Sequence, residues 1–358
     1  MFERSKKTSW FGRKPSAPNK FEHAIASAQL PHACNGVTVS VNELSFYQLH
    51  AKRWQPPAKS LWSQLNGQHT SAHKGQGMTF SEVRQYQAGD DVRQIDWRVT
   101  ARTGKVHTKL FTEERERPVI LFIDLTPSMF SGTQLLLKSV QMCHLASLLS
   151  WTSIINKDRV GAIIRSGETL TEIRPSSSKV ALLQLLHRLS HIHNNGLTYN
   201  TNKQAPNKPT TLHSTISQNP LSINLDTHNS ERQQALKKAA QLCRKGSELI
   251  ILSDFSDFSQ HDMTSIAQIS THNKVRAMQI YDPIELGETQ AKGNQTLCGK
   301  EHVMLVNLSN TKVKQSINEA FSQQQQQLAE QFGQYNIALS LISSGTPILQ
   351  QLRPHTVK

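Results

Sequence analysis

The stretch "VILFIDLTPSMFSGTQ", residues 119–134, decides which fold the chain is predicted to adopt. It opens with five apolar residues in a row, a pattern typical of a strand that is covered on both faces of a sheet. Asp124, Thr126 and Ser128 follow at alternate positions. Alternate side chains of an extended loop lie on one side, so three oxygen donors come together. Such residues either cap the next helix or bind a hard cation, and both interpretations are open at this point.

After residue 117, apolar runs alternate with stretches that have helical spacing. The expected further strands are residues 159–165, 248–254, 274–282 and 335–342, and the expected helices are residues 133–153, 178–192, 230–243 and 311–332. Strands and helices that alternate in this way form a mostly parallel sheet with helices on both faces. The predicted fold class is therefore α/β, with a doubly wound, mostly parallel sheet.

Composition and pattern divide the chain into three regions. Residues 1–35 are basic and polar and are expected to form a disordered tail. Residues 36–116 are expected to be a smaller β-rich region, in which residues 95–101 alternate between apolar and polar as a half-buried strand does. Residues 117–358 are the expected α/β domain. Within it, residues 194–230 are rich in Asn, Thr, Ser and Pro and predict a low-order insertion.

The charge and the cysteines bear on partners and on the cellular compartment. Lys and Arg number 40 against 26 Asp and Glu, and the resulting net charge of +14 favours acidic partners, including nucleic acid. The four cysteines lie far apart, which favours a reducing compartment over a disulfide framework. The chain has no signal-peptide core and no apolar window of the ~18 to 20 residues that a spanning helix needs. We expect a cytoplasmic protein without a membrane span, with peripheral attachment at the inner membrane as a further option.

A second carboxylate is expected beside the first three oxygen donors. Asp254 ends the apolar run "ELIILSD" as Asp124 ends "VILFID". Ligands of open α/β sheets bind at the carboxyl ends of the strands, where these two residues would meet. Carboxylate and hydroxyl oxygens suit Mg²⁺, and also Mn²⁺ or Ca²⁺, better than Zn²⁺. The candidate metal ligands are therefore Asp124, Thr126, Ser128 and Asp254.

Two motifs resemble known families. Asp124-x-Thr126-x-Ser128 resembles the D-x-S-x-S signature of the metal-ion-dependent adhesion site of von Willebrand factor A domains. The stretch "RQYQAGDDVRQIDWRVTARTGKVHTKLFTEE" resembles the hallmark of the domain of unknown function 58, a bacterial family with a von Willebrand factor A-like domain. The positions that carry this second resemblance are Arg84, Tyr86, Gly89, Asp90, Asp91, Arg93, Ile95, Asp96, Trp97, Ala101 and Arg102. "YDPIEL", with Asp282 and Glu285, is a further landmark of the family.

The resemblance implies a von Willebrand factor A-like fold and a non-enzymatic role as a protein-interaction or adaptor module. Members of the family are commonly encoded beside MoxR-type AAA+ ATPases. The implied partners are such an ATPase and other von Willebrand A-like proteins, in chaperone-like or complex-maturation work. At an adhesion site of this type, an acidic side chain of the partner completes the ligands of the ion.

This sequence departs from the adhesion-site pattern in two respects. Thr126 stands where serine is usual. The site also normally takes a threonine from another loop, which the motif itself does not contain. Candidates for that threonine are Thr198, Thr210, Thr211 and Thr227.

The "GDDVRQIDW" motif has two interpretations. In the first, the motif has a functional role, either as a docking surface or as a support for the metal-binding loop. In the second, it is an internal network of salt bridges in which Trp97 packs against the sheet. In that network three aspartates hold three arginines: Asp90, Asp91 and Asp96 with Arg84, Arg93 and Arg102.

Other classes of function have weaker support in the sequence. A basic nucleic-acid-binding protein is the main alternative, although no recognition motif is present. A metal-dependent hydrolase is a third alternative, but no general base can be identified near the candidate metal ligands. The chain contains neither a G-x-x-x-x-G-K-[ST] phosphate loop nor a G-x-S-x-G elbow. We therefore predict that the protein is not an enzyme.

Overall fold

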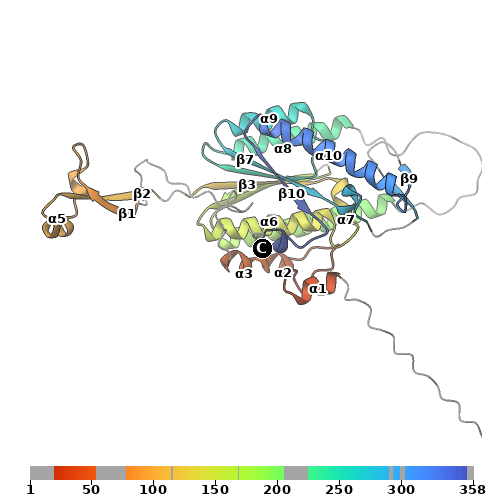
Figure 1. The fold of residues 1–358 in the computed structure, drawn as a ribbon, viewed down its shortest axis with the longest axis horizontal. Helices are drawn as coiled ribbons and strands as arrows, with labels where there is room; N and C mark the ends of the chain where they lie inside the picture. Colours follow the sequence, from red (N-terminus) through yellow and green to blue (C-terminus); the bar gives the residue numbers. More distant parts are fainter. Residues whose placement is uncertain are drawn as a thin grey trace, which may run out of the picture.

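The computed structural model describes residues 20–53, 78–113, 116–167, 169–204, 225–289, 293–298 and 303–352. Its centre is a six-stranded sheet with the strand order β10-β7-β6-β3-β4-β5 (Figure 1). The strands are β3 (Pro118–Leu125), β4 (Arg159–Ser166), β5 (Thr169–Ser176), β6 (Glu248–Ser253), β7 (Lys274–Tyr281) and β10 (Ala338–Ser343). Neighbouring strands are parallel except for β4 and β5.

The strand order explains where a ligand site is expected. The first strand of the sheet, β3, lies in the centre, and the order reverses between β3 and β6. Doubly wound sheets bind ligands outside the carboxyl ends of their strands at such a switch point. The chain therefore has the predicted doubly wound, mostly parallel α/β fold.

Helices cover both faces of the sheet (Figure 1). One face carries α6 (Lys138–Ile155), α7 (Lys179–Gln204), α11 (Ile348–Gln351) and the N-terminal helices, and the other carries α8 (Leu225–Leu242), α9 (Gln260–Ser270) and α10 (Thr311–Gly333). Alternate residues of β3 enter two different cores. Leu121 and Ile123 pack on the side of α6, whereas Ile120 and Phe122 pack on the side of α8. The apolar run of β3 is unbroken because both of its faces are buried.

The N-terminal helices belong to the core around α6. They are α1 (Lys20–Ala26), α2 (Val41–Ser45) and α3 (Tyr47–Arg53). Residues 20–35, expected to be part of a disordered tail, are therefore ordered, because Ala24 and Leu30 are buried in this core. Residues 1–19 of the expected tail lie outside the described residues.

A separate two-stranded unit precedes β3 in the chain (Figure 1). Its strands β1 (Met78–Gln85) and β2 (His107–Glu113) are antiparallel, and the short 3-10 helix η1 (Val92–Gln94) and α5 (Trp97–Thr103) lie between them. The prediction of a strand over residues 95–101 is wrong, because most of these residues form α5. Asp96 caps this helix by accepting hydrogen bonds from the backbone N–H groups of Arg98 and Val99. These bonds satisfy the first donors of the helix, and this local effect outweighs the alternating pattern.

The insertion expected over residues 194–230 is partly helical. Helix α7 continues to Gln204 and α8 begins at Leu225, while residues 205–224 lie outside the described residues. The sequence also did not predict β5, α9 and the hairpin of β8 (Asn294–Cys298) with β9 (Val303–Asn307). Among the helices that the structure describes, none is long and apolar enough to cross a membrane.

Candidate functional site

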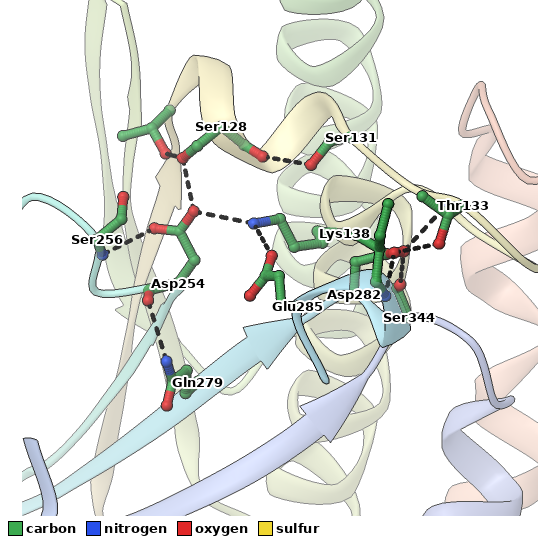
Figure 2. A network of polar contacts seen from close by, with 12 residues as sticks. Ser128, Ser131, Thr133, Lys138, Asp254, Ser256, Gln279, Asp282, Glu285 and Ser344 are labelled. Carbon is green, nitrogen blue, oxygen red and sulfur yellow. Dashed lines mark hydrogen bonds and ion pairs between the residues drawn. The ribbon is translucent and has the colours of Figure 1, made fainter. Parts of the chain in front are cut away.

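Three of the four predicted metal ligands, Thr126, Ser128 and Asp254, lie together beyond the carboxyl ends of β3 and β6, and Figure 2 shows Ser128 beside Asp254. Asp124 lies at the end of β3, and Thr126 is the N-cap of the 3-10 helix η2 (Pro127–Phe130). The hydroxyl oxygens of Thr126 and Ser128 are 3.0 Å apart. Ser128 Oγ donates a hydrogen bond of 2.6 Å to Asp254 Oδ2, which joins the two strand ends. Thr126, Ser128 and Asp254 are therefore neighbours, as the sequence predicted, whereas the carboxylate of Asp124 has other contacts.

Asp124 has a buried cation of its own. Arg165, which lies opposite Asp124 in the register of β3 and β4, donates from Nε to Asp124 Oδ1 at 2.7 Å. Ser253 Oγ donates to the other carboxylate oxygen at 2.9 Å. Burial raises the pKa of Asp124, the positive charge of Arg165 opposes this effect, and the nearby Asp254 adds to it. Both oxygens of Asp124 are thus engaged within the protein.

Asp254 also has an internal cation, which comes from the first turn of α6. Lys138 Nζ lies 3.2 Å from Asp254 Oδ2 and 2.8 Å from Glu285 Oε1. Burial acts to raise the pKa of Asp254, but Lys138 and the hydrogen bonds from Ser128 and Ser256 outweigh it and hold the pKa below its usual value. The two carboxylates together raise the pKa of Lys138, although burial opposes them. A lysine in the first turn of a helix is disfavoured by the helix dipole, so these carboxylates explain its position.

Asp282 connects the loop that follows η2 to the neighbouring strands through hydrogen bonds (Figure 2). It is buried, and its carboxylate accepts hydrogen bonds from Thr133 N at 2.9 Å, from Thr133 Oγ1 and from Ser344 Oγ at 2.7 Å. It also accepts from Ile284 N and so caps the 3-10 helix η3 (Pro283–Leu286), which carries Glu285. Asp282 therefore orients both the loop before Lys138 and the helix that supplies the second acceptor of Lys138.

The oxygen donors do not fit a divalent ion well in this arrangement. Three carboxylates, those of Asp124, Asp254 and Glu285, already contact two cationic side chains, Arg165 and Lys138. A divalent ion beside them would be repelled by both cations at short range in a poorly solvated site, where charges interact strongly. The hydroxyl groups of Thr126 and Ser128 are also hydrogen-bonded already. Metal binding at these four residues therefore stays a prediction, and the geometry favours internal ion pairs.

The additional loop threonine is not identified by the structure. Thr198 is exposed on α7, and its hydroxyl donates to the backbone oxygen of Asn194 at 3.0 Å. Thr210 and Thr211 lie outside the described residues, as does the side chain of Thr227.

The "GDDVRQIDW" motif forms the segment between β1 and β2. Of the ion pairs predicted there, Arg84 with Asp90 is present at 2.7 Å. Asp91 instead accepts from the backbone N–H of Arg93 and caps η1. Asp96 caps α5 and lies 3.6 Å from Lys109. The backbone N–H of Val99 is the main reason why the pKa of Asp96 is lowered. The aspartates are thus held mainly by local backbone groups.

Two further positions of the motif are structural. Gly89 has a φ of 107°, a left-handed conformation that glycine adopts without strain, and lies in the turn after β1. The backbone N–H of Tyr86 donates to the backbone oxygen of Val106 at 2.8 Å, which extends the pairing of β1 and β2.

Several other side chains of this segment face solvent. Trp97 is 69% exposed and Val92 is 61% exposed, so the packing of Trp97 against the sheet that the sequence suggested is wrong. Four exposed cations accompany them: Arg93, Arg98, Arg102 and Lys105. An exposed tryptophan among arginines is typical of a protein-interaction surface.

The sequence missed Arg165, Lys138 and Glu285 as parts of the strand-end site. Arg165 and Lys138 are charged residues in otherwise apolar elements, and both are almost fully buried. A buried charge requires a partner of opposite sign. This requirement was the available signal, but the sequence could not say which carboxylate each cation contacts.

Comparisons with known proteins show related sequences of unassigned role. Uncharacterized protein Mb1516 of Mycobacterium bovis and Uncharacterized protein Rv1480 of Mycobacterium tuberculosis are each 34% identical over 109 residues. The match covers 30% of this chain and 34% of each relative, so it spans much less than the whole length of either.

Solved structures give likenesses at low sequence identity. BatB from Bacteroides thetaiotaomicron has a TM-score of 0.35 and 12% identity, with 63% of this chain and 90% of that chain covered. The von Willebrand factor type A protein from Catenulispora acidiphila has a TM-score of 0.22 and 11% identity, with 60% and 44% covered.

A family model gives the broadest match. Residues 82–329 match the family described as "Protein of unknown function DUF58". This range contains the motif segment, the strand-end site and most of the sheet, and it is more than half of the 358 residues. The protein therefore belongs to the DUF58 family.

Proposed function

We propose that the protein is a non-enzymatic interaction module that docks a partner through the exposed side chains of η1 and α5. We call this surface the docking face and define it by Val92, Arg93, Trp97, Arg98 and Arg102. The observation that carries the proposal is the exposure of Trp97, 69%, within the motif that marks the family.

The side chains of the docking face have the properties of an interface. Tryptophan and arginine dominate the binding energy of many interfaces, and a tryptophan buries about 150–250 Å² when a partner covers it. The aspartates of the same segment bind backbone groups, Arg84 or Lys109, so the arginines of the docking face keep their charge available. This charge favours a partner with acidic groups around an apolar pocket. By family resemblance, a MoxR-type AAA+ ATPase is the first partner to test, and other von Willebrand A-like proteins follow.

Divalent ions have no necessary role in this docking. A metal-assisted contact would place an ion at Asp124, Thr126 and Ser128, with Asp254 nearby, and would use a carboxylate of the partner as its last ligand. Because Arg165 and Lys138 already neutralise the two aspartates, we propose that the strand-end site works as a rigid internal ion-pair network instead.

The test measures the affinity of wild-type protein, Trp97→Ala and Tyr199→Ala for a MoxR-type AAA+ ATPase from the same organism. Tyr199 is the matched control, because it is an aromatic residue that is 56% exposed on α7, away from the docking face. We expect Trp97→Ala to weaken binding by about tenfold or more, the scale of an interface hot spot. Tyr199→Ala should bind as wild type does. Unchanged affinity of Trp97→Ala would exclude this docking face.

Two further measurements distinguish this proposal from metal-assisted docking and from nucleic-acid binding. Equal affinity in Mg²⁺ and in EDTA agrees with ion-independent docking, whereas a loss in EDTA that Asp124→Ala reproduces would establish the metal-assisted contact. Binding of generic DNA with a steep dependence on salt would instead support the nucleic-acid alternative suggested by the net charge of +14.

A further inference from the structure

A second polar cluster lies in the core beside α6, and its residues belong neither to the docking face nor to the strand-end site. It consists of Cys34, Glu43 and His144, which are 5%, 1% and 0% exposed. The thiol sulfur, a carboxylate oxygen and an imidazole nitrogen of these residues all lie within 4.8 Å of one another. Among the described residues, this is the group of at least three His, Cys, Asp or Glu side chains whose ligand atoms lie close enough together to hold a metal ion.

Three different segments bring these residues together. Cys34 lies in the loop before α2, Glu43 is in the first turn of α2, and His144 lies in the middle of α6. One carboxylate oxygen of Glu43 accepts the backbone N–H of Ser40 in a capping box. The other oxygen faces His144 Nε2 at 2.6 Å. The capping box therefore fixes the direction in which Glu43 points into the core.

Two buried polar atoms beside the cluster have no hydrogen-bond partner among the described residues. They are Tyr47 Oη and His144 Nδ1, and both side chains are fully buried. The rings of Tyr47 and His144 pack with their centroids 5.3 Å apart, and burial, with the nearby Cys34 and Glu43, raises the pKa of the Tyr47 hydroxyl. Native proteins rarely leave buried polar atoms unpaired, so the Tyr47 hydroxyl beside the cluster calls for an explanation, whereas an ion on Nε2 of His144 would leave its Nδ1 without a partner.

We propose that Cys34, Glu43 and His144 bind a structural Zn²⁺ ion. The ligand atoms would be Cys34 Sγ, a Glu43 carboxylate oxygen and His144 Nε2, which leaves the fourth position of a tetrahedral set for a water molecule or a further side chain. A thiolate, an imidazole and a carboxylate are the ligand types that zinc takes, in contrast to the all-oxygen donors at the strand ends. The ion would fasten the segment of α2 and α3 to α6.

Binding changes the protonation of the cluster without any redox step. The Cys34 thiol loses its proton to solvent as the sulfur–zinc bond forms. The ring proton of His144 moves from Nε2, where the zinc binds, to Nδ1. Glu43 exchanges its hydrogen bond to His144 for a bond to the ion. The simpler interpretation, in which Glu43 and His144 are only a buried hydrogen-bonded pair, predicts no affinity for a metal.

The test uses the full chain, stripped of metal under reducing conditions and titrated with Co²⁺, which replaces zinc and reports its ligands by absorption. We expect one Co²⁺ per chain with a thiolate-to-cobalt charge-transfer band. Added Zn²⁺ should remove this band and raise the thermal midpoint. Absence of the band in the wild-type protein would overturn the proposal.

Variants identify the ligands. Cys34→Ser should abolish the band, whereas Cys243→Ser should retain it, because Cys243 is a buried cysteine in the core on the other face of the sheet. Cys143→Ser should also retain it, and a band that persists in Cys34→Ser but disappears in Cys143→Ser would refute the assignment. Glu43→Gln keeps groups that can hydrogen-bond to Ser40 and His144, so it should fold, and we expect it to bind at least tenfold more weakly. Circular dichroism of each variant checks the fold.

Discussion

Replacing Lys138 by methionine removes the cation at the centre of the strand-end site while keeping most of the volume of the side chain. The side chain of Lys138 is 5% exposed, and its ammonium group serves both Asp254 and Glu285. Breaking a buried ion pair by removing one partner costs about 3–5 kcal/mol. Glu285 is 28% exposed and its pKa is raised mainly by burial, so it can hydrate or accept a proton. We therefore expect a loss near the lower limit, about 3 kcal/mol of unfolding free energy.

The assay is urea unfolding at neutral pH, with circular dichroism as the signal. Lys237→Met is the matched control, because Lys237 is exposed on α8, and its unfolding free energy should stay within about 0.5 kcal/mol of wild type. A loss below about 1 kcal/mol for Lys138→Met would be typical of an ordinary, exposed pair and would refute the reasoning.

The same variant also tests the metal prediction and the pH dependence. With the cation removed, the oxygens of Asp254 and Ser128 should accept Mg²⁺, so millimolar Mg²⁺ should raise the stability of Lys138→Met and leave the wild type unchanged. Because Lys138 holds the folded-state pKa of Asp254 below its unfolded value, this stabilisation is present above the unfolded pKa. It is lost as the pH falls through the folded pKa. The stability difference between wild type and variant should therefore narrow in acid.

Three further predictions concern other parts of the molecule. Burial is the main cause that lowers the pKa of His193 to about 4. Between pH of about 6.5 and 4 the unfolded chain binds a proton at this residue and the folded chain does not, so the wild type should lose on the order of 3 kcal/mol of unfolding free energy as the pH falls through this range. In His193→Gln the unfolding free energy, measured with urea, should depend less on pH over this range, and an equal dependence in both proteins would contradict the buried, neutral state. Asp96→Ala removes the cap of α5 and should destabilise the helix by about 1 kcal/mol, seen as faster amide hydrogen exchange in α5, whereas Asp96→Asn should restore most of the protection. Trp97→Ala should change the unfolding free energy by no more than about 0.5 kcal/mol, because the side chain is mostly exposed, and a larger loss would show that it packs against the protein.

Much of the α/β fold is predictable because its strands and helices have strong local patterns. β3 and β6 each contain an unbroken apolar run, residues 119–123 and 249–252, and α10 repeats apolar residues at helical spacing, so that Phe321, Leu328 and Phe332 are buried on one side. That Asp124 and Asp254 lie at the same edge of the sheet follows from the same reasoning, since the carboxyl ends of neighbouring parallel strands lie at one edge. The motif segment was harder to predict, because the alternation of residues 95–101 indicates a strand while the hydrogen bonds of Asp96 produce a helix.

The sequence by itself determined the mostly parallel α/β class, the family motif and the positions of the oxygen-bearing residues at the strand ends. Only the tertiary structure decided what those residues contact. Arg165 reaches Asp124 from the neighbouring strand, and Lys138 reaches Asp254 across 116 positions of the chain. The same holds for Glu43 and His144, which are 101 positions apart. Local patterns arise from short-range backbone and burial preferences, whereas the neutralisation of a buried charge depends on which distant side chain folding brings within hydrogen-bond distance.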